Sequence, residues 1–373
     1  MKRFIEENKE SIYEILRDLC LIPAPSGYED GRAEYCKRRL ESFGAKGVCI
    51  DEAKNVVFGI GCEDSDSITV IAAHTDTVFP DREPMLYSDD GEMIRSPGVG
   101  DDTAGVAVLL LTAKYFIERD IRPRDGILFV LNSCEEGLGN LKGVRRIFAD
   151  YSGRVSRFVT LDSTLESIVD KCVGSHRYEL RVKTEGGHSY GSFGNANAIV
   201  EASRIIGEIY SIDVPRVGNS KTTYNVGHIS GGTSVNTIAE EATMLVEYRS
   251  DDEKCLAIMK DKFEEIFERA RGRLKGLDVS LIGERPCMGG VDPDMQKGLG
   301  DLLSDIITRV TGNTPIRRSG STDCNIPLSL GIPAVSIGVY SGGGAHTRDE
   351  YILRDTLPLG LEASMLVAEA LAK

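Results

Sequence analysis

Apolar runs and amphipathic segments alternate along the first part of the sequence. Residues 4–21 place apolar side chains at helical spacing, which predicts a helix. Short continuous apolar runs follow at 68–73, 126–131 and 157–161, a pattern typical of strands buried on both faces. Residues 104–117 have the composition of a buried helix. This alternation predicts an α/β fold with a mainly parallel sheet.

A short motif after the first predicted helix has the form of a capping box. Ser26 and Glu29 have the Ser-x-x-Glu spacing in which the two side chains satisfy backbone N–H groups at the start of a helix. The motif predicts a second helix that runs to about Phe43.

The pattern changes between residues 174 and 286. Strands at 178–184 and 242–250 alternate apolar and polar side chains, and amphipathic helices are expected at about 196–211 and 252–271. Strands with one apolar face and helices on that face predict a smaller α+β domain.

The α/β pattern returns after Pro286. We expect a helix near 292–311, a strand at 334–339 and a final helix near 356–372. One domain is therefore predicted to be inserted into another. The predicted boundaries are 1–173 and 287–373 for the first domain and 174–286 for the inserted domain.

Charge and composition exclude several classes of partner. The 373 residues include 58 Asp+Glu and 44 Lys+Arg, a formal net charge of −14, which opposes binding to nucleic acid or anionic membrane. The sequence has no apolar stretch of about 18 residues, and its first residues lack the apolar centre of a signal peptide. Nine Cys without a Cys-x-x-Cys pair indicate reduced thiols. We expect a cytoplasmic protein with no nucleic-acid or membrane partner.

Acidic and imidazole side chains recur at one edge of the predicted sheet. In open α/β sheets, ligands bind outside the carboxyl ends of the strands. The side chains in question are His74 and Asp76 after 68–73, Glu135 and Glu136 after 126–131, Asp162 after 157–161, His346 after 334–339, and Asp101 and Asp102 in a Gly-rich loop before 104–117.

This residue set predicts a metal centre. Imidazoles and carboxylates without thiolates suit Zn²⁺, Mn²⁺ or Co²⁺. Two such ions about 3.5–4 Å apart can activate one water and polarise a carbonyl. Of the adjacent pair Glu135 and Glu136, one carboxylate can hold metal while the other acts as general base. Asp76 can accept the second N–H of His74 and fix its tautomer.

An ordered set of motifs resembles a known family. The motifs are AHTDTVF, GVGDDTAG, CEEGLG, LDS, GGHSYG, GGTSVNTIAEEA with the YRSDD strand, and GAHTRDE. They resemble the co-catalytic metallohydrolases that include peptidase T, glutamate carboxypeptidase, acetylornithine deacetylase, succinyl-diaminopimelate desuccinylase and the aminoacylases. The GDDTAGVA segment is most similar to the peptidase T version, although Thr103 stands where family members commonly have Lys.

The resemblance implies a role for each residue of the centre. It implies that His74 and Asp162 bind one ion and that Glu136 and His346 bind the other. Asp101 would bridge the ions, and Asp102 is the alternative that fits the motif spacing less well. Glu135 would be the general base and acid, and Asp76 would orient His74.

The resemblance also implies that the inserted domain is a lid and dimerisation domain of a homodimer. His188 would stabilise the oxyanion, within its own subunit or in the partner's site. Asn236 and Arg249 would hold substrate, Arg249 through a carboxylate. The alternatives are that Asn236 caps a turn and that Arg249 is a charge on a strand surface. A structural role is the better interpretation of His176, and His228 is ambiguous.

The expected function is that of a metallopeptidase or amide hydrolase with two divalent ions, zinc first and manganese or cobalt as alternatives. A tripeptide aminopeptidase is the first candidate, and an N-acyl-amino-acid deacylase or carboxypeptidase is the alternative within the family. A non-catalytic metal- or peptide-binding homologue is the alternative from another class.

A family of larger aminopeptidases shares the PSGxE opening, here PSGYE, but inserts its extra domain between the first His and the bridging Asp. The gap from 74 to 101 is 27 residues, too short for a domain.

Overall fold

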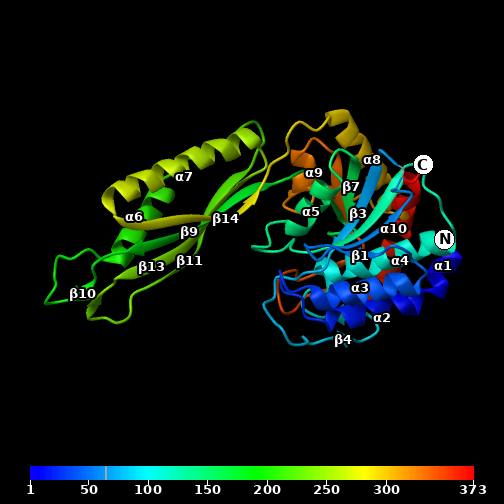
Figure 1. The fold of residues 1–373 in the computed structure, drawn as a ribbon, viewed down its shortest axis with the longest axis horizontal. Coiled ribbons are helices and arrows are strands. Elements are labelled where there is room, and N and C mark those ends of the chain that lie inside the picture. Colours follow the sequence, from blue (N-terminus) through cyan, green and yellow to red (C-terminus); the bar gives the residue numbers. More distant parts are fainter. Residues whose placement is uncertain (64) are drawn as a thin grey trace. The chain divides into compact units, whose positions relative to one another are not determined.

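Two compact units make up the protein. The computed structural model describes residues 1–63 and 65–373. One unit comprises Met1–Cys172 and Gly289–Lys373, and the other comprises Val173–Met288. The borders predicted from the sequence are 173/174 and 286/287. Figure 1 shows the elements of each unit.

The first unit is built on an eight-stranded sheet in the order β1-β2-β6-β3-β7-β16-β8-β15. The strands are β1 (Cys49–Ile50), β2 (Val56–Ile60), β3 (Ile68–His74), β6 (Gly126–Asn132), β7 (Val155–Thr160), β8 (Ser167–Cys172), β15 (Ile316–Gly320) and β16 (Ala334–Ile337). The central strand β3 pairs in parallel with β6 and β7, and β7 pairs in parallel with β16. The predicted α/β fold with a mainly parallel sheet is confirmed.

Helices surround this sheet. They are α1 (Lys2–Glu7), α2 (Lys9–Cys20), α3 (Asp30–Ser42), α4 (Gly105–Glu118), α5 (Lys142–Asp150), α8 (Pro293–Thr311), α9 (Asn325–Ser329) and α10 (Leu357–Leu371). Helix α4 is buried along most of its length because most of its side chains are apolar. Helix α10 packs against it (Figure 1).

The single helix predicted over residues 4–21 is wrong, because the chain breaks at Asn8 into α1 and α2. The Asn8 side chain donates to the carbonyl of Phe4 at 2.8 Å and accepts from Lys114 Nζ at 2.6 Å. A buried Asn side chain that bonds to the backbone competes with the helical hydrogen-bond pattern.

The predicted capping box is also wrong. Helix α3 begins at Asp30 with Glu29 as N-cap and without a side-chain cap hydrogen bond. Ser26 donates instead to the carboxylate of Asp76 at 2.6 Å. The Ser26 hydroxyl therefore bonds to Asp76, which is distant in the sequence, and not to the start of the helix as the local motif predicts.

A small antiparallel sheet brings distant segments of the first unit together. Its order is β17 (Gly342–Gly343), β18 (Tyr351–Leu353), β5 (Met93–Arg95) and β4 (Ser88–Asp89). Ile352 of β18 pairs with Ile94 of β5. The loop that follows β5 and the loop that precedes β18 are therefore neighbours.

The second unit is a four-stranded antiparallel sheet with two helices on one face (Figure 1). Its sheet contains β11 (Thr222–Gly231), β13 (Glu241–Ser250), β9 (Gly174–Lys183) and β14 (Gly276–Arg285), the helices are α6 (Ala198–Ile209) and α7 (Glu253–Arg273), and β10 (Gly187–His188) pairs with β12 (Thr237–Ile238). Alternate side chains of β13, such as Met244, Val246 and Tyr248, are buried with apolar side chains of both helices. The one-sided strands predicted for this region are present.

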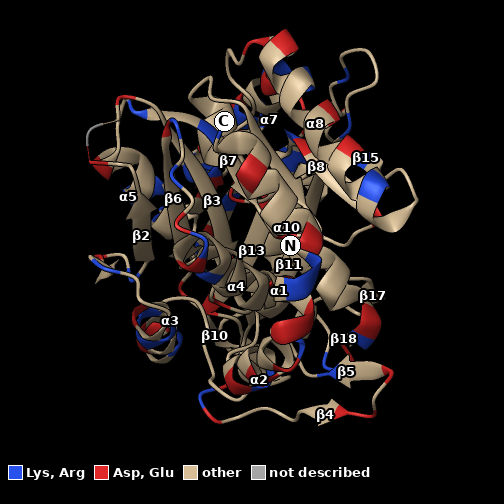
Figure 2. Cartoon of the chain, turned by 90° about the vertical axis from the view of Figure 1, so that its right-hand side faces the viewer, with Lys and Arg blue, Asp and Glu red and all other residues tan. Residues whose placement is uncertain are grey.

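Several helices of the first unit carry both basic and acidic side chains. In Figure 2, Lys and Arg lie among Asp and Glu on α1, α3 and α8. Across residues 1–63 and 65–373, no helix has the length and apolar character that a membrane crossing requires.

Candidate dinuclear metal centre

The carboxyl ends of four buried strands carry the predicted ligands. His74 is the last residue of β3, Asp162 lies two residues beyond β7, and His346 follows β16 through a Gly-rich loop. Glu136 follows β6 after Cys134, which has a φ of +58°. Such a backbone conformation is uncommon for a residue with a side chain, and it directs the chain after β6 into a sharp turn.

Asp101 lies between the two imidazoles. His74 Nε2 is 3.0 Å from Asp101 Oδ1, and His346 Nε2 is 3.0 Å from Asp101 Oδ2. His346 Nε2 is also 3.4 Å from Glu136 Oε1. The two oxygens of one carboxylate thus face two different groups of side chains.

These contacts define two potential ligand groups that share Asp101. One contains His74, Asp101 and Asp162, and the other contains Asp101, Glu136 and His346. Within each group the candidate ligand atoms lie within 4.8 Å of one another. Imidazole and carboxylate donors at this spacing fit two borderline divalent cations with Asp101 as the bridge. We call these five residues the candidate centre.

The electrostatics of the candidate centre favour positive charge within it. Burial lowers the pKa of His74, but hydrogen bonds to Asp101 and Asp76 outweigh it and raise the pKa well above its ordinary value. Hydrogen bonds to Asp101 and Glu136 raise the pKa of His346 to about 11. Burial and the nearby charge of Asp101 raise the pKa of Asp162 to about 7. Bound protons thus offset the negative charge of the carboxylates at positions where divalent cations would also offset it.

Asp76 lies behind the candidate centre and holds the two glutamates. Its Oδ1 accepts from the backbone N–H of Glu135, and its Oδ2 from that of Glu136, both at 3.0 Å. His74 Nδ1 is 3.0 Å from the backbone carbonyl of Asp76 and 3.5 Å from its carboxylate. With Nδ1–H donated to that carbonyl, Nε2 keeps its lone pair for the candidate centre. The structure therefore adds the positioning of Glu135 to the predicted role of Asp76.

Glu135 lies beside the candidate centre. It is 5 % exposed, and a carboxylate oxygen of Glu135 lies within 4.8 Å of ligand atoms of His74 and Glu136. A carboxylate in this position can reach a water that is bound between the two ligand groups.

Two further buried aspartates, Asp102 and Asp323, lie outside the candidate centre. Asp102 Oδ2 accepts from the backbone N–H of His74 at 2.9 Å, and the side chain is fully buried. Asp323 Oδ2 accepts from Asn132 Nδ2 at 2.6 Å. Each belongs to the support around β3 and β6 and to neither ligand group.

The predicted substrate residues lie in the second unit, where two of them are neighbours. His188 and Asn236 lie on the paired strands around β10 and β12, and Ser189 N–H donates to the carbonyl of Asn236 at 2.9 Å. Arg249 lies near the other end of β13, about 26 Å along the strand from Glu241 at about 3.3 Å per residue. Its guanidinium binds both carboxylate oxygens of Glu247, at 2.8 and 3.0 Å.

The remaining histidines of the second unit have different surroundings. His176 is 8 % exposed, and its ring contacts the hydroxyl of Tyr248 and, at 3.3 Å, the carboxylate of Glu284. His228 is exposed on β11, next to a register shift in that strand. Neither belongs to a ligand group.

Sequence reasoning missed buried residues that support the candidate centre. Glu29 Oε1 accepts from the backbone N–H of Cys134 at 3.2 Å. Arg32 is fully buried and donates to the carbonyl of Thr75 at 3.0 Å and to Thr103 Oγ1 at 3.1 Å. The PSGYE motif contains Glu29, but its Ser-x-x-Glu spacing predicts a helix cap and not the contact with Cys134.

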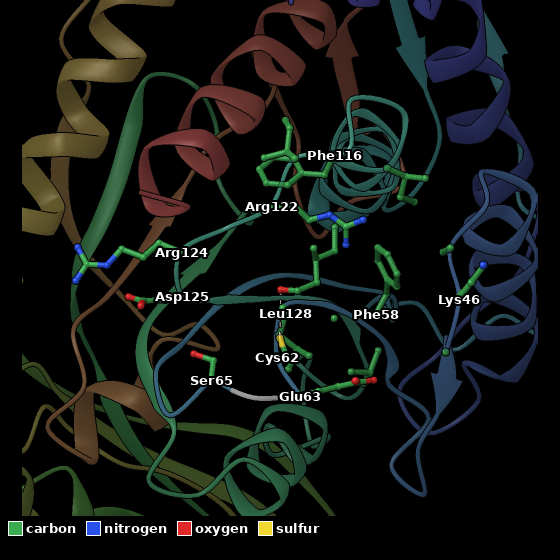
Figure 3. A pocket seen from close by; sticks show the side chains of 18 of the residues that line it. Lys46, Phe58, Cys62, Glu63, Ser65, Phe116, Arg122, Arg124, Asp125 and Leu128 are labelled. Atoms are coloured by element: carbon green, nitrogen blue, oxygen red, sulfur yellow. Dashed lines mark hydrogen bonds between the residues drawn. The ribbon is translucent and has the colours of Figure 1, made fainter.

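A hollow of the first unit, drawn in Figure 3, is lined by other residues. It has a volume of about 1030 Å³ and is lined at the amino ends of β3 and β6 by Ser67 and Asp125. Figure 3 shows Phe58, Phe116 and Leu128 together with Arg122 around it. None of the residues predicted for the candidate centre lines this hollow.

Comparisons with known proteins connect this geometry to a family. The sequence model described as peptidase family M20/M25/M40 matches residues 70–370. Succinyl-diaminopimelate desuccinylase of Corynebacterium glutamicum is 26% identical over 337 residues, which cover 88% of this chain and 88% of that protein.

Two solved structures are similar over nearly the whole length. Aminopeptidase PepT of Bacillus cereus has a TM-score of 0.74 and 21% identity and covers 98% of this chain and 99% of its own. The YxeP protein of Bacillus subtilis, described as a dinuclear metal-binding peptidase, has a TM-score of 0.67 and 16% identity and covers 100% and 99%. These two likenesses show the fold.

Proposed function

The chain belongs to peptidase family M20/M25/M40 and is a hydrolase of amide bonds, and from that premise we propose a two-metal enzyme that acts on short peptides, with tripeptide aminopeptidase activity as the first candidate. The observation that carries the proposal is the position of Asp101, whose two oxygens face two ligand groups. A single carboxylate in that position is what a pair of ions needs as a bridge.

Each proposed ion has its own ligands. His74 and Asp162 would hold one ion, Glu136 and His346 would hold the other, and Asp101 would bridge them. We propose zinc, with manganese or cobalt as alternatives that suit the same donors. When bound, two such ions lower the pKa of a water and polarise the amide carbonyl.

Glu135 moves the proton in the proposed reaction. Its carboxylate accepts a proton from the attacking water and delivers it to the leaving nitrogen as the amide bond breaks. Asp76 supports this step because it holds the backbone N–H groups of Glu135 and Glu136 on its two oxygens. The position of the base is thereby tied to the position of a ligand.

His188 is the proposed donor to the oxyanion. Its Nδ1 accepts from the backbone N–H groups of Tyr190 and Gly191, both at 3.3 Å. The proton of a neutral ring is then on Nε2, which can donate to the developing negative charge. Asn236, beside His188, and Arg249 are proposed to hold the substrate, and Arg249 would have to share its guanidinium between Glu247 and a substrate carboxylate.

The end of the substrate that is recognised separates the two leading candidates. An aminopeptidase needs a free α-amine, whereas a deacylase or carboxypeptidase depends on the α-carboxylate. Rates should be measured for a tripeptide, its N-acetylated form and its amidated form. Loss of activity on acetylation supports the aminopeptidase, and equal rates with and without the acetyl group contradict it.

Deacylation of an N-acyl amino acid is the second candidate. It is favoured by the similarity to a succinyl-diaminopimelate desuccinylase over 88% of this chain. Hydrolysis of N-succinyl and N-acetyl amino acids, faster than hydrolysis of the matching tripeptide, would identify this activity. A non-catalytic binding protein is disfavoured because the chain retains all five proposed ligands and Glu135.

A cytoplasmic homodimer formed through the second unit is also part of the proposal. Strand β11 is an edge of its sheet, and Ile229 on that strand and Ile199 and Val200 on α6 are 42–47 % exposed. Light scattering on a sizing column is expected to give twice the chain mass. A monomer at assay concentration would exclude action of His188 in a partner's site.

A further inference from the structure

Glu350 is a buried carboxylate that has no role in the proposed reaction. It lies four residues after His346, at the end of the GAHTRDE motif, and it is 1 % exposed. Its Oε2 accepts from the N–H of Gly98 at 2.7 Å, and its Oε1 accepts from the N–H groups of Gly100 and Asp101 at 2.8 and 2.9 Å. Three backbone donors of the Asp101 loop therefore converge on one side chain.

The Asp101 loop needs its glycines to take this shape. Gly98 has a φ of +74°, and a Cβ there would lie 2.7 Å from the side chain of Thr77. A Cβ on Gly100 would lie 2.4 Å from the ring of Tyr340. The loop thus passes close to two side chains while its N–H groups point to Glu350.

Glu350 ends the loop that carries His346, and it contacts the loop that carries Asp101. Strand β18, which begins at Tyr351, pairs with β5, and the N–H of Ser96 donates to the carbonyl of Glu350 at 3.2 Å. The backbone of Glu350 is therefore tied to the segment before Asp101, and its side chain is tied to the loop itself. His346 lies just before Glu350 on the same loop.

Burial of a carboxylate at this position has a free-energy cost that a neutral side chain would avoid. Glu350 is buried, and it lies next to Asp101 in a region that is already rich in carboxylates. Hydrogen bonds from three N–H groups offset the loss of water. Two divalent cations would offset the negative charge.

We propose that Glu350 is a positioning residue of the candidate centre, which fixes the Asp101 backbone so that both carboxylate oxygens face their ligand groups and which links that loop to the loop of His346. The proposal rests on the two-metal centre of the proposed function. The proposal goes beyond that function because Glu350 is neither a ligand nor a base.

Replacement by Gln tests the proposal with little change in volume. The amide of Glu350→Gln has one acceptor oxygen, so its NH₂ group would face a backbone N–H where a carboxylate oxygen accepted. Loss of a partner that orients a ligand typically lowers metal affinity by about 10–100-fold. Glu350→Asp keeps the charge but is shorter by about 1.5 Å, one C–C bond, so it should restore affinity in part.

Asp292→Ala is a matched control for lost stability. Asp292 caps α8 in the same unit, where its carboxylate accepts from the N–H groups of Asp294 and Met295 at 2.9 and 3.0 Å. It is not among the candidate ligands. Its removal costs about 1 kcal/mol of stability, without a change at the candidate centre.

The experiment measures Co²⁺ binding by calorimetry and the visible absorption of bound Co²⁺, with folding checked by circular dichroism. We expect Glu350→Gln to bind Co²⁺ at least about tenfold more weakly than wild type, with an altered absorption spectrum, and Asp292→Ala to match wild type. If Glu350→Gln does not fold, Glu350→Asp is compared with Asp292→Ala in its place, and a loss of Co²⁺ affinity no larger than that of Asp292→Ala overturns the proposal. For Glu350→Gln the threshold is tenfold. A loss smaller than tenfold, or an equal loss in Asp292→Ala, overturns the proposal. A wild type that binds no Co²⁺ contradicts the two-metal function itself, a result that differs from failure of the Glu350 variants alone.

Discussion

The two ends of the large sheet differ in how their polar side chains are arranged. At the amino ends of β3 and β6 lies a hollow of about 1030 Å³, lined by apolar side chains and by charges of both signs such as Lys46, Asp66 and Arg122. At the carboxyl ends lie imidazoles and carboxylates whose candidate ligand atoms approach one another within 4.8 Å. His74 and Glu136 are buried there, and His346 is exposed. We therefore place the proposed chemistry where candidate ligands converge and not at the hollow.

The largest expected effect is at the carboxyl end. Glu135→Gln removes the proposed proton acceptor while it keeps the size of the side chain. We expect kcat to fall by about 10²–10⁴-fold, the range for a general acid–base group, with metal content close to normal. Steady-state kinetics on the best substrate of the peptide assay would check this. Activity within tenfold of wild type would mean that another group takes the proton.

Removal of metal should destabilise only the protein with an intact candidate centre. Free metal at 1000 times its Kd stabilises the folded state by about 4 kcal/mol, so complete chelation should lower Tm by on the order of 10 °C. Repulsion among the uncovered carboxylates acts in the same direction. Differential scanning calorimetry with and without chelator measures this shift. His346→Ala should respond less, and an unchanged wild-type Tm would argue against a bound metal.

The pH dependence of the metal-free protein should have a defined sign. Burial raises the pKa of Asp162 to about 7, so its contribution to stability falls between about pH 4 and pH 7. Hydrogen bonds to Asp101 and Glu136 raise the pKa of His346 to about 11, so its contribution is complete below about pH 6.5 and is lost as the pH rises toward 11.

Both groups therefore make the metal-free protein less stable as the pH rises from 5 to 9. Metal binding needs the deprotonated ligands, so the difference in Tm between metal-bound and metal-free protein should widen over the same range. Melting curves in matched buffers test the direction. A difference that narrows with rising pH would be inconsistent with these protonation states.

Variants at the amino end should have the smallest effect. Lys46→Ala and Arg122→Ala change the charge that lines the large hollow but leave every candidate ligand in place. We expect kcat/KM within about twofold of wild type, because surface substitutions of this kind usually change free energies by about 0.5 kcal/mol or less. A tenfold loss in either variant would show that the two ends are coupled.

The central strands and the strand-end residues could be predicted because burial on both faces leaves a clear signal. The apolar runs at 68–73, 126–131 and 157–161 correspond to β3, β6 and β7. Edge strands leave a weaker signal, and β15 (Ile316–Gly320), with the sequence IRRSG, is largely exposed and has no apolar pattern. Strands β2 and β8 are also absent from the predicted set, although both lie inside the sheet and contain buried residues.

The support around the candidate centre could not be predicted from local patterns. Ser26, Glu29 and Glu350 act through backbone N–H groups or side chains that lie far away in the sequence. Ser26 shows the difficulty most clearly, since its spacing to Glu29 fits a helix cap but its hydroxyl bonds to Asp76. Such contacts depend on tertiary structure and override the local preference.

The proposed bridging role of Asp101 is tested most directly by counting metal ions. Purified wild type, Glu135→Gln and Asp101→Ala should be dialysed against limiting Zn²⁺ and analysed by inductively coupled plasma mass spectrometry. We predict two ions per chain in wild type and in Glu135→Gln, and the loss of both in Asp101→Ala, because one carboxylate serves both ligand groups. A wild type with fewer than two ions, or an Asp101→Ala variant that keeps two, would contradict the account.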